Sequence, residues 1–514
     1  MPIHSQDVPR SSPGRVGMTA RRGPERPSMS SMALDRGAEM PLHLQLAGQL
    51  RARILDGSLP PGTRLPSSRD MAKELGCARA IVLAACELLY AEGCLVSRPR
   101  GGVRVASTGR PSGPLIAAPS PRSEAPGPEA GRWSSRWSFL LESRYESDSA
   151  SPFSTGTPDI EGFPFETWAR LLRQSWRRPP RGACIDMPAL GWGPLREATS
   201  EFLGAVRGLL CAPEEVAITP ASSGALDLCC RMLLDPGDEV WVEEPGFIEA
   251  RWSLKAAGAR LVPVPVDEKG LVVAEGIRRA PHAKLAVVTP SNQFPLGVAM
   301  SLERRLELLD WAARQGAWII EDDYNSEFRH RAGMLASLRS LDRQGRVLYL
   351  GTFSKVMLPS LRIGYLVADR RVIDAFGRGR ARIDVHTAGT VQPALTAFLR
   401  EGHMLRHLRR LRALYAQRQR AVLLALDAVL AEELELCPIS AGLHLTALFT
   451  PAMAGRMTDR EASERSRRIG SYIQPLSQCY LGSPERQGLV LGYGSLPAGE
   501  ALPRLSVLAR ELRL

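Results

Sequence analysis

From residue 151 to residue 514, strand-like apolar stretches alternate with helix-like stretches, and this alternation constrains the fold more than any other feature of the chain. Such an order is typical of an α/β domain, in which helices cover a β-sheet. One strand-like stretch, residues 347–350, runs directly into the segment Gly-Thr-Phe-Ser-Lys, which ends at Lys355. Arg362 and Gly364 follow nearby. Lys355 is therefore a candidate for a functional side chain at the end of a strand.

Lysine is rare in this chain, with five lysines among 66 basic residues. Because arginine supplies almost all of the positive charge, a lysine after small hydroxyl residues indicates a need for amine chemistry. An ammonium, unlike a guanidinium, can be converted to a neutral, nucleophilic amine, and its most direct use is a Schiff base with pyridoxal 5'-phosphate (PLP). The alternative is a lysine in a surface loop without a chemical role.

The length of 514 residues predicts two or more domains. No apolar run is long enough to span a membrane, and the first residues contain no apolar signal core, so we expect a cytoplasmic protein. The nine cysteines include no Cys-x-x-Cys pair, which argues against a disulfide framework and against a zinc site. We therefore expect reduced thiols and no metal.

The net charge of +12 is unevenly distributed, because residues 1–110 contain 16 basic and 9 acidic residues and so account for +7. A basic bias in a small terminal module indicates a polyanionic partner, most simply nucleic acid. The alternative is a solvated basic tail.

Composition divides the chain into four segments. Residues 1–38 are rich in Ser, Pro, Gly and Arg without periodicity, which predicts a disordered tail. Residues 107–150 are rich in Pro, Ser and Gly and are expected to form a semi-stiff linker. Between these two segments, residues 39–106 are expected to form a compact module. Residues 151–514 form the alternating region described above.

Residues 39–106 have the pattern of three helices followed by a hairpin. Leucine and isoleucine recur at helical spacing over residues 43–56. Further helices are predicted over residues 67–76 and 78–92, each ended by a glycine, and a short hairpin with a basic turn over residues 95–105. This order predicts a winged helix-turn-helix, whose third helix enters the major groove of DNA while the wing contacts the backbone.

The segment from Gly57 to Arg69 reads Gly-x-Leu-x-Pro-Gly-x-x-Leu-Pro-Ser-Ser-Arg and resembles the hallmark of GntR-type DNA-binding domains. The resemblance implies that DNA is a partner and that the start of the third helix contacts it. The DNA-binding residues that we predict are Arg69, Ser67, Ser68, Arg79, Arg98, Arg100 and Arg104.

Two departures from the GntR pattern concern the groups that read bases. Ala78, Ala80 and Ile81 stand where that family usually has Ser, Thr or Asn, and the wing has Arg-Gly-Gly-Val from Arg100 where Gly-Ser-Gly-Thr is usual. Methyl groups replace hydrogen-bond donors, whereas the arginines keep the charge. We therefore expect affinity for the DNA backbone to survive better than sequence specificity.

Four motifs support the PLP hypothesis for Lys355. A strand-to-helix turn at residues 219–224 contains Ser222 and Ser223 and can cradle a phosphate at a helix N-terminus. Phe247 follows a strand and can stack on the pyridine ring, or it can simply belong to the core. Asn292 lies in a third strand-end motif, residues 289–297.

The fourth motif is Glu-Asp-Asp-Tyr after the strand at residues 318–320. Because side chains alternate between the faces of a strand, Asp322 and Tyr324 share a face if the strand continues, and Asp323 points away. A carboxylate can pair with the pyridinium nitrogen, and a phenol can bond the ring hydroxyl. We assign these roles to Asp322 and Tyr324.

Thr352, Ser354 and Arg362 complete the predicted cofactor site as phosphate contacts around Lys355. Arg251, four residues beyond Phe247, is a candidate for binding the carboxylate of an effector, with a surface helix arginine as the alternative.

The ordered motifs resemble those of fold-type I aminotransferases, and together with a GntR-type domain they resemble the MocR/GabR family of PLP-binding transcriptional regulators. The motifs in question are Thr-Pro-Ser-x-Gln-Phe-Pro-Leu-Gly, Glu-Asp-Asp-Tyr-x-Ser-Glu-Phe-Arg and Gly-Thr-Phe-Ser-Lys. The resemblance implies a mixed, mainly parallel sheet, PLP as cofactor and a homodimer. Several positions differ from the family: Ala221 replaces Gly in a loop that also lacks the usual Gln side chains, Asn292 replaces His, and Asn325 stands where Asp is common.

The leading hypothesis is a PLP-dependent, DNA-binding transcriptional regulator that senses an amino compound, or PLP itself, through the aldimine at Lys355. A second hypothesis is a PLP-dependent aminotransferase with a vestigial or tethering DNA-binding domain. A third is a regulator whose large domain has lost PLP.

Overall fold

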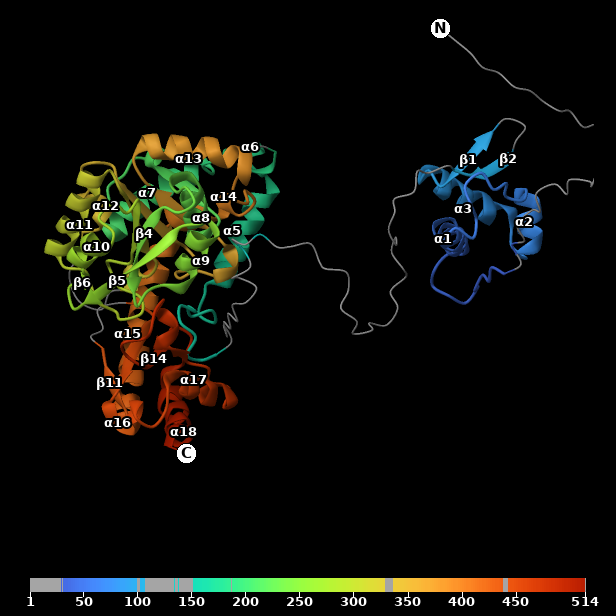
Figure 1. Ribbon diagram of the computed structural model, residues 1–514. Coiled ribbons are helices and arrows are strands. Elements are labelled where there is room, and N and C mark those ends of the chain that lie inside the picture. Colours follow the sequence, from blue (N-terminus) through green and yellow to red (C-terminus); the bar gives the residue numbers. More distant parts are fainter. Residues whose placement is uncertain are drawn as a thin grey trace, which may run out of the picture. The chain divides into compact units, whose positions relative to one another are not determined.

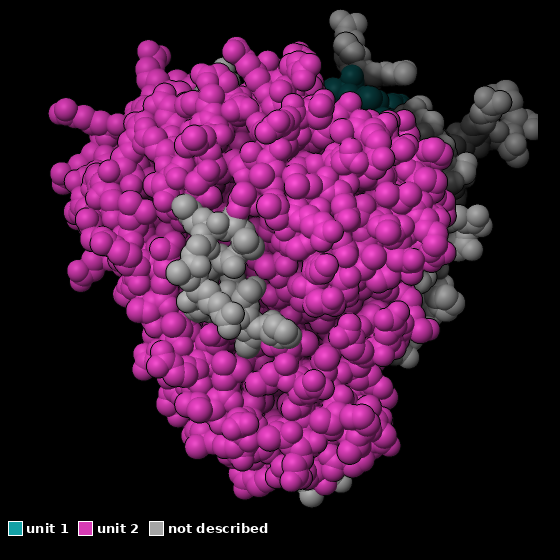
Figure 2. Space-filling model, turned by 90° about the vertical axis from the view of Figure 1, so that its left-hand side faces the viewer, with its two compact units in different colours: residues 1–130 teal, residues 131–514 magenta. Residues whose placement is uncertain are grey.

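The computed structural model divides the chain into two compact units, residues 1–130 and residues 131–514 (Figure 2). The boundary between the units falls within the segment predicted as a linker. The residues that the structure describes are Met29, 31–98, 102–106, Ser134, Trp137, 151–185, 187–328, 336–437 and 442–513.

The first unit is a winged helix-turn-helix, as the sequence predicts. Its elements are α1 (Leu42–Leu55), α2 (Ser68–Glu74), α3 (Arg79–Ala91), β1 (Leu95–Arg98) and β2 (Gly102–Val105). The two strands pair antiparallel, and Leu46, Leu50, Val82 and Leu89 lie in the core between the helices. Ser67 caps α2 by accepting a hydrogen bond from the Asp70 amide at 3.2 Å, so a capping signal in the sequence fixes where this helix begins.

Described residues before residue 39 already pack on this unit, so the predicted disordered tail, residues 1–38, extends too far at its C-terminal end. Met29 and Met32 are buried in the helical core, and the Arg36 guanidinium donates a hydrogen bond to the Gly76 carbonyl at 2.7 Å. These residues lack helical periodicity, and the energy of burying two methionine side chains orders them instead.

The second unit is built on an eight-stranded sheet in the order β3-β10-β9-β8-β7-β4-β5-β6. Strands β4, β5 and β6 of this sheet are labelled in Figure 1. Its strands are β3 (Val216–Thr219), β4 (Glu239–Glu244), β5 (Arg260–Asp267), β6 (Gly270–Leu271), β7 (Leu285–Val288), β8 (Trp318–Asp323), β9 (Val347–Thr352) and β10 (Gly364–Val367). The five central strands, from β9 to β5, are parallel, whereas β10 pairs antiparallel with β3 and β9, and β6 with β5. The predicted mixed, mainly parallel sheet is confirmed.

Helices cover both faces of this sheet because the side chains of each strand alternate between two apolar layers. In β4, Val240 and Val242 face the layer formed with α8, α9 and α13, whereas Trp241 faces α10, α11 and α12 and stacks on Trp311 at a ring-centroid distance of 3.8 Å. The helices of the large domain are α5 (Phe165–Arg177), α6 (Arg181–Cys184), α7 (Gly193–Arg207), α8 (Ala221–Leu233), α9 (Ile248–Ala256), α10 (Val273–Arg279), α11 (Leu302–Gln315), α12 (Leu338–Leu341), α13 (Arg370–Ile383) and α14 (Gln392–Arg400).

The long helix α15 (His403–Leu430) leads to a smaller antiparallel sheet in the order β11-β12-β14-β13. Figure 1 labels α15 with β11 and β14. Its strands and flanking helices are β11 (Leu434–Leu436), β12 (His444–Phe449), α16 (Pro451–Ala454), α17 (Asp459–Arg468), β13 (Gln474–Pro475), β14 (Gly488–Gly492) and α18 (Ala501–Arg513). Among the described residues, no helix is both long and apolar enough to cross a membrane.

The packing of Met32 yields a stability prediction. Replacing Met32 by Ala should destabilise the first unit by about 2 kcal/mol or more, because it removes a buried side chain from the core. Amide hydrogen exchange of α1 and α3 measures this loss. The control is Met40→Ala, since Met40 is 56% exposed and its truncation should leave the exchange rates unchanged. Equal effects of the two substitutions would contradict the packing of the segment before residue 39.

Candidate functional site

Lys355 lies three residues beyond the end of β9, where the chain leaves the carboxyl edge of the sheet. Its Nζ donates a hydrogen bond to the carbonyl of Gly156 at 2.9 Å. Burial of the ammonium lowers the pKa of Lys355, and the nearby Arg362 cation acts in the same direction, while the carboxylates of Glu249 and Asp322 oppose the shift. A lysine with a lowered pKa provides more of the neutral amine that attacks a carbonyl.

Gly156 brings the chain into contact with this amine from a distant part of the sequence. A Cβ at this position would lie 2.4 Å from the Lys355 Nζ, and the backbone has a φ of +77°, which a side chain disfavours. We call residues 151–157 the strap, because Gly156 within this segment contacts the Lys355 amine. The sequence offers no signal for this contact, because the two residues are 199 positions apart.

Asp322 is the penultimate residue of β8 and is buried, with 6% of its surface exposed. No described residue donates a hydrogen bond to its Oδ1. Burial raises the pKa of Asp322 to about 7, the charge on Asp323 adds to the shift, and Lys355 counteracts it. A buried carboxylate without a donor is costly, and a cationic N–H group such as the pyridinium of PLP would satisfy it.

Asp323 occupies the opposite face of β8, as the alternation rule predicts. It forms a buried ion pair with Arg207 at 2.6 Å and accepts a hydrogen bond from the Tyr349 hydroxyl at 2.7 Å. Arg207 also donates to Ser291 at 3.2 Å. This network holds the end of β8, so Asp323 is a structural residue whereas Asp322 stays available for a ligand.

Tyr324 and Asn292 meet beside Asp322. The Asn292 side-chain amide donates to the Tyr324 hydroxyl at 3.1 Å, and this hydroxyl donates to the backbone carbonyl of Asn292 at the same distance. The Asn292 Oδ1 has no donor among the described residues. Burial raises the pKa of Tyr324 well above its ordinary value, so this residue acts as a neutral hydrogen-bond donor. Both residues can therefore contact a polar substituent of the ring.

His444 also lies in this region, although it belongs to none of the sequence motifs that predict the cofactor site. It belongs to β12 of the smaller sheet, and its ring stacks on Tyr324 at a centroid distance of 6.4 Å. Burial lowers the pKa of His444 to about 4, and the Lys355 ammonium acts in the same direction. The imidazole is therefore neutral at pH 7.

Phe247 and Asp322 line the same small cavity, together with Val242, Ala250 and Thr289. Phe247 packs against Phe294 with a ring-centroid distance of 5.7 Å and an interplanar angle of 76°. An aromatic ring beside the carboxylate that would bind the pyridinium nitrogen fits the predicted stacking role.

The predicted phosphate contacts gather at the N-terminus of α8. Ser222 and Ser223 lie in its first turn, and the Arg362 guanidinium donates to the Ser223 hydroxyl at 2.9 Å. Ala221 has a left-handed φ of 63°, so the chain adopts a glycine-like conformation here despite its side chain. Free backbone N–H groups, two hydroxyls and one guanidinium form a suitable phosphate cradle.

Thr352 and Ser354 complete the turn before Lys355. The Thr352 hydroxyl accepts a hydrogen bond from the Ser354 amide at 3.1 Å, which fixes the turn. The Ser354 Oγ is buried and has no partner among the described residues. Ser354 Oγ is thus a third orphaned polar atom in the described part of this region, after Asp322 Oδ1 and Asn292 Oδ1, and a phosphate oxygen would satisfy it.

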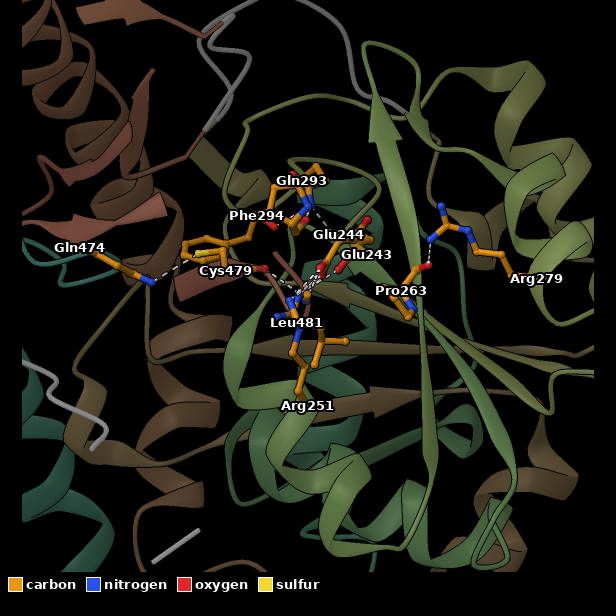
Figure 3. A network of polar contacts seen from close by, with 12 residues as sticks. Glu243, Glu244, Arg251, Pro263, Arg279, Gln293, Phe294, Gln474, Cys479 and Leu481 are labelled. Atoms are coloured by element: carbon orange, nitrogen blue, oxygen red, sulfur yellow. Dashed lines mark hydrogen bonds and ion pairs between the residues drawn. The ribbon is translucent and has the colours of Figure 1, made fainter. Parts of the chain in front are cut away.

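Arg251 has a different environment from the one predicted for it (Figure 3). It is buried and forms an ion pair with Glu244 at 2.9 Å, and it also donates to the carbonyl groups of Glu243 and Cys479. Its carboxylate partner is therefore a residue of the same chain. This network ties α9 to the segment before β14, so the structure favours a structural role over the effector-binding role.

In the first unit, the start of α2 and the start of α3 lie together. The Arg79 Nε donates to the Ser68 hydroxyl at 3.0 Å. Arg69, the next residue of α2, is exposed. Ser67 is used as the helix cap, and Arg104 donates to the Gly62 carbonyl at 2.7 Å. The side chain of Arg98 and the whole of Arg100 lie outside the described residues, so their predicted DNA contacts stay predictions.

No group of three or more His, Cys, Asp or Glu side chains within the described ranges could hold a metal ion. The residues around Lys355 instead provide a carboxylate for a cationic nitrogen, an aromatic face, a phosphate cradle and an amine.

Comparison with known proteins agrees with both units. Residues 187–486 match the family "Aminotransferase class I and II", and residues 42–105 match "Bacterial regulatory proteins, gntR family". The chain is 40% identical over 465 residues to the probable rhizopine catabolism regulatory protein MocR of Rhizobium meliloti, covering 90% of this chain and 92% of that protein. It is 31% identical to the pyridoxine biosynthesis transcriptional regulator PdxR of Corynebacterium glutamicum, covering 88% and 91%.

Among solved structures, the second unit is similar to LysN, an α-aminoadipate aminotransferase of Thermus thermophilus in complex with N-(5'-phosphopyridoxyl)-L-leucine. The TM-score is 0.65 with 27% identity, covering 74% of this chain and 95% of LysN.

Asp322 yields a prediction in which two properties change in opposite directions. Asp322→Asn should weaken PLP binding about 10- to 100-fold, because it removes a charge-assisted hydrogen bond. The same change should stabilise the protein without PLP, because the carboxyl is costly to ionise in its buried site. Titration of the visible absorption band and thermal unfolding measure the two effects.

The pH dependence follows from the raised pKa of Asp322. Its contribution to stability is present at low pH and is lost as the pH rises from 3.8 toward about 7, so the wild type should lose stability relative to Asp322→Asn over this range. Asp310→Asn, which alters an exposed carboxylate on α11, is the control. A parallel pH dependence of the wild type and Asp322→Asn would contradict the assigned pKa.

Three observations lead to one conclusion. They are the two family matches, the 40% sequence identity to MocR over 90% of this chain, and the PLP-compatible residues around Lys355. The chain belongs to the MocR/GabR family of PLP-dependent, DNA-binding transcriptional regulators, in which a GntR-type domain is fused to an aminotransferase-like domain.

Proposed function

We propose that this regulator senses a small primary amine at Lys355 and transmits its presence to the DNA-binding domain. The observation that carries the proposal is the contact between Lys355 and Gly156. Gly156 belongs to the strap, residues 151–157, which directly follows the segment that connects the two units. A change in the bonding of the Lys355 amine therefore alters a hydrogen bond to the part of the chain that leads to the DNA-binding domain.

Bound PLP supplies an aldehyde that condenses reversibly with primary amines and a ring that withdraws electrons. Asp322 would bind the ring nitrogen, Phe247 would stack on the ring, and Ser223 with Arg362 would hold the phosphate. Because these residues fix the cofactor independently of Lys355, an incoming amine can compete with the Lys355 amine while the cofactor stays in place.

Release of Lys355 from the cofactor changes the hydrogen bond that its nitrogen can donate to the Gly156 carbonyl. A free ammonium and a nitrogen bound to the cofactor differ in charge and in the number of protons that they can donate. The strap then has two arrangements, and a ligand that favours one of them shifts the population. Coupling of about 1–3 kcal/mol between the two sites is typical of such systems and changes DNA affinity about 5- to 150-fold.

The assembly that we propose is a homodimer acting in the cytoplasm on promoter DNA. Phe165 and Trp176 lie on α5 with exposed fractions of 48% and 55%. Large apolar side chains in such positions support a contact with a second copy of the chain. PLP itself is an alternative effector, because the phosphate cradle and Asp322 recognise the cofactor directly.

An aminotransferase activity is the second candidate function, favoured by the retained Lys355 and Asp322 and by the similarity to LysN. Lys355 would move a proton at the α-carbon of an amino acid. Sustained turnover of an amino acid with a 2-oxo acid at about 1 per second or faster would support an enzyme. Stoichiometric reaction without turnover would support the regulator.

Lys355→Ala tests the sensing role. With PLP added, the variant should lose the visible absorption band of the cofactor-bound amine and the response of DNA binding to amines, while basal DNA affinity stays within about twofold of the wild type. The probes are a panel of amino acids and aliphatic amines, each paired with its tertiary amine analogue, which cannot condense with an aldehyde. Lys284→Ala, an exposed lysine outside the site, is the control. A Lys355→Ala protein that still responds to amines would contradict covalent sensing.

Arg79→Ala provides the complementary test. It should weaken DNA binding by about 1–3 kcal/mol, because it removes a charged group from the start of the recognition helix, while leaving the PLP spectrum unchanged. Gel retardation with the DNA upstream of the gene measures the first effect. If DNA affinity is unchanged, the assigned orientation of α3 is wrong.

A further inference from the structure

The solvent-facing side of α3 carries apolar side chains beside two charged ones. Ala80 and Leu83 are exposed, with 44% of the Leu83 surface accessible, and Ala84 is half-buried beside them. The opposite side of the helix is already committed to the core, since Val82, Ala85, Cys86 and Leu89 are buried there. Leu83 therefore keeps much of its apolar surface outside this core, and Arg79 and Glu87 are the exposed charged residues of this helix.

Helical geometry places these exposed side chains together. At 3.6 residues per turn, Arg79, Leu83, Glu87 and Ala80 project within an arc of about 100°. At a rise of 1.5 Å per residue, Leu83 lies about 6 Å further along the helix axis than Arg79, which corresponds to roughly two base pairs of DNA. A single docked helix can thus bring Arg79 and Leu83 to neighbouring bases.

Charge complementarity identifies DNA as the occupant of this face. Arg69 and Arg79 are exposed at the adjacent helix starts, and the N-terminus of α3 carries no side-chain cap, because Ala78 cannot accept a hydrogen bond. Unsatisfied backbone N–H groups and two guanidinium groups favour phosphates. A protein partner would instead find an apolar patch of one leucine and two alanines, which is too small for a stable interface.

The chemistry of the face determines which base edges it can read. Ala80 and Leu83 have no donor or acceptor, so they cannot recognise the polar edges of guanine, cytosine or adenine. The apolar group in the major groove is the C5-methyl of thymine, and aliphatic side chains contact it favourably. Arg79 uses its Nε for Ser68, so its two Nη nitrogens are positioned as a fork for the O6 and N7 atoms of guanine.

We propose that α3 reads thymine methyl groups: Leu83 and Ala80 contact the C5-methyls of thymines that lie within about two base pairs of a guanine bound by Arg79. This inference rests on the proposed operator recognition and specifies how it occurs. It also revises the expectation that the alanine substitutions in α3 reduce specificity, since apolar side chains still discriminate thymine from the other bases.

The test compares thymine with uracil, which differs only by the methyl group. The full-length protein first selects preferred sequences from a pool of random duplexes at fixed salt. The selected duplex is then synthesised with either base, and the Kd ratio is measured for the wild type, Leu83→Ala and Leu44→Ala. Leu44 is a matched control, because it is 42% exposed but lies on α1.

The wild type and Leu44→Ala should bind the thymine duplex more tightly by about fourfold for each buried methyl group. In Leu83→Ala the preference for thymine over uracil should fall about fourfold below that of the wild type. The variant should still fold, since Leu83 is exposed. Equal ratios for the wild type and Leu83→Ala, or a ratio of one for the wild type, would overturn the methyl readout alone. A pool that yields no preferred sequence would contradict both operator recognition and this readout, because methyl contacts are sequence-specific.

Discussion

The parallel pairing of β8 with β7 and β9 is the constraint on which the cofactor site depends. In this register Asp322 lies opposite Leu350 and Asp323 opposite Gly351, so the carboxyl ends of β8 and β9 meet at one edge of the sheet. The Asp322 carboxyl and the turn before Lys355 are brought together there without any direct bond between them. A slip of one residue would exchange Asp322 and Asp323 between the two faces and would place the wrong carboxylate in the site.

The two aspartates show how the same residue type serves two purposes. Asp323 is paired with Arg207 and Tyr349 and stabilises the strand end, whereas Asp322 keeps an oxygen without a donor among the described residues. Burial of an unpaired carboxyl costs free energy, and the fold sustains this cost because the surrounding sheet packs so well. A cofactor with a cationic nitrogen relieves the cost, so binding and stability are linked.

Much of this arrangement could be predicted because it follows from local rules. The strand-end motifs, the separation of Asp322 from Asp323 and the serine that caps α2 depend on periodicity two, helix capping and short-range spacing. Side chains that pair across long stretches of sequence could not be found in this way. Arg251 meets Cys479 across 228 positions and Arg207 meets Asp323 across 116, and both contacts depend on how the sheet closes. The burial of Met32 could not be predicted, because the segment around it has no helical pattern in the sequence.

Hydrogen exchange of the strap, residues 151–157, measures whether the amine site at Lys355 is coupled to the chain segment leading to the DNA-binding domain. The amides of the strap would be followed in the PLP-loaded full-length protein before and after addition of an amine that changes the visible spectrum. We expect a change in protection there, because Lys355 no longer offers the Gly156 carbonyl the same donor. Unchanged exchange in the strap, alongside a clear spectral change, would contradict this coupling.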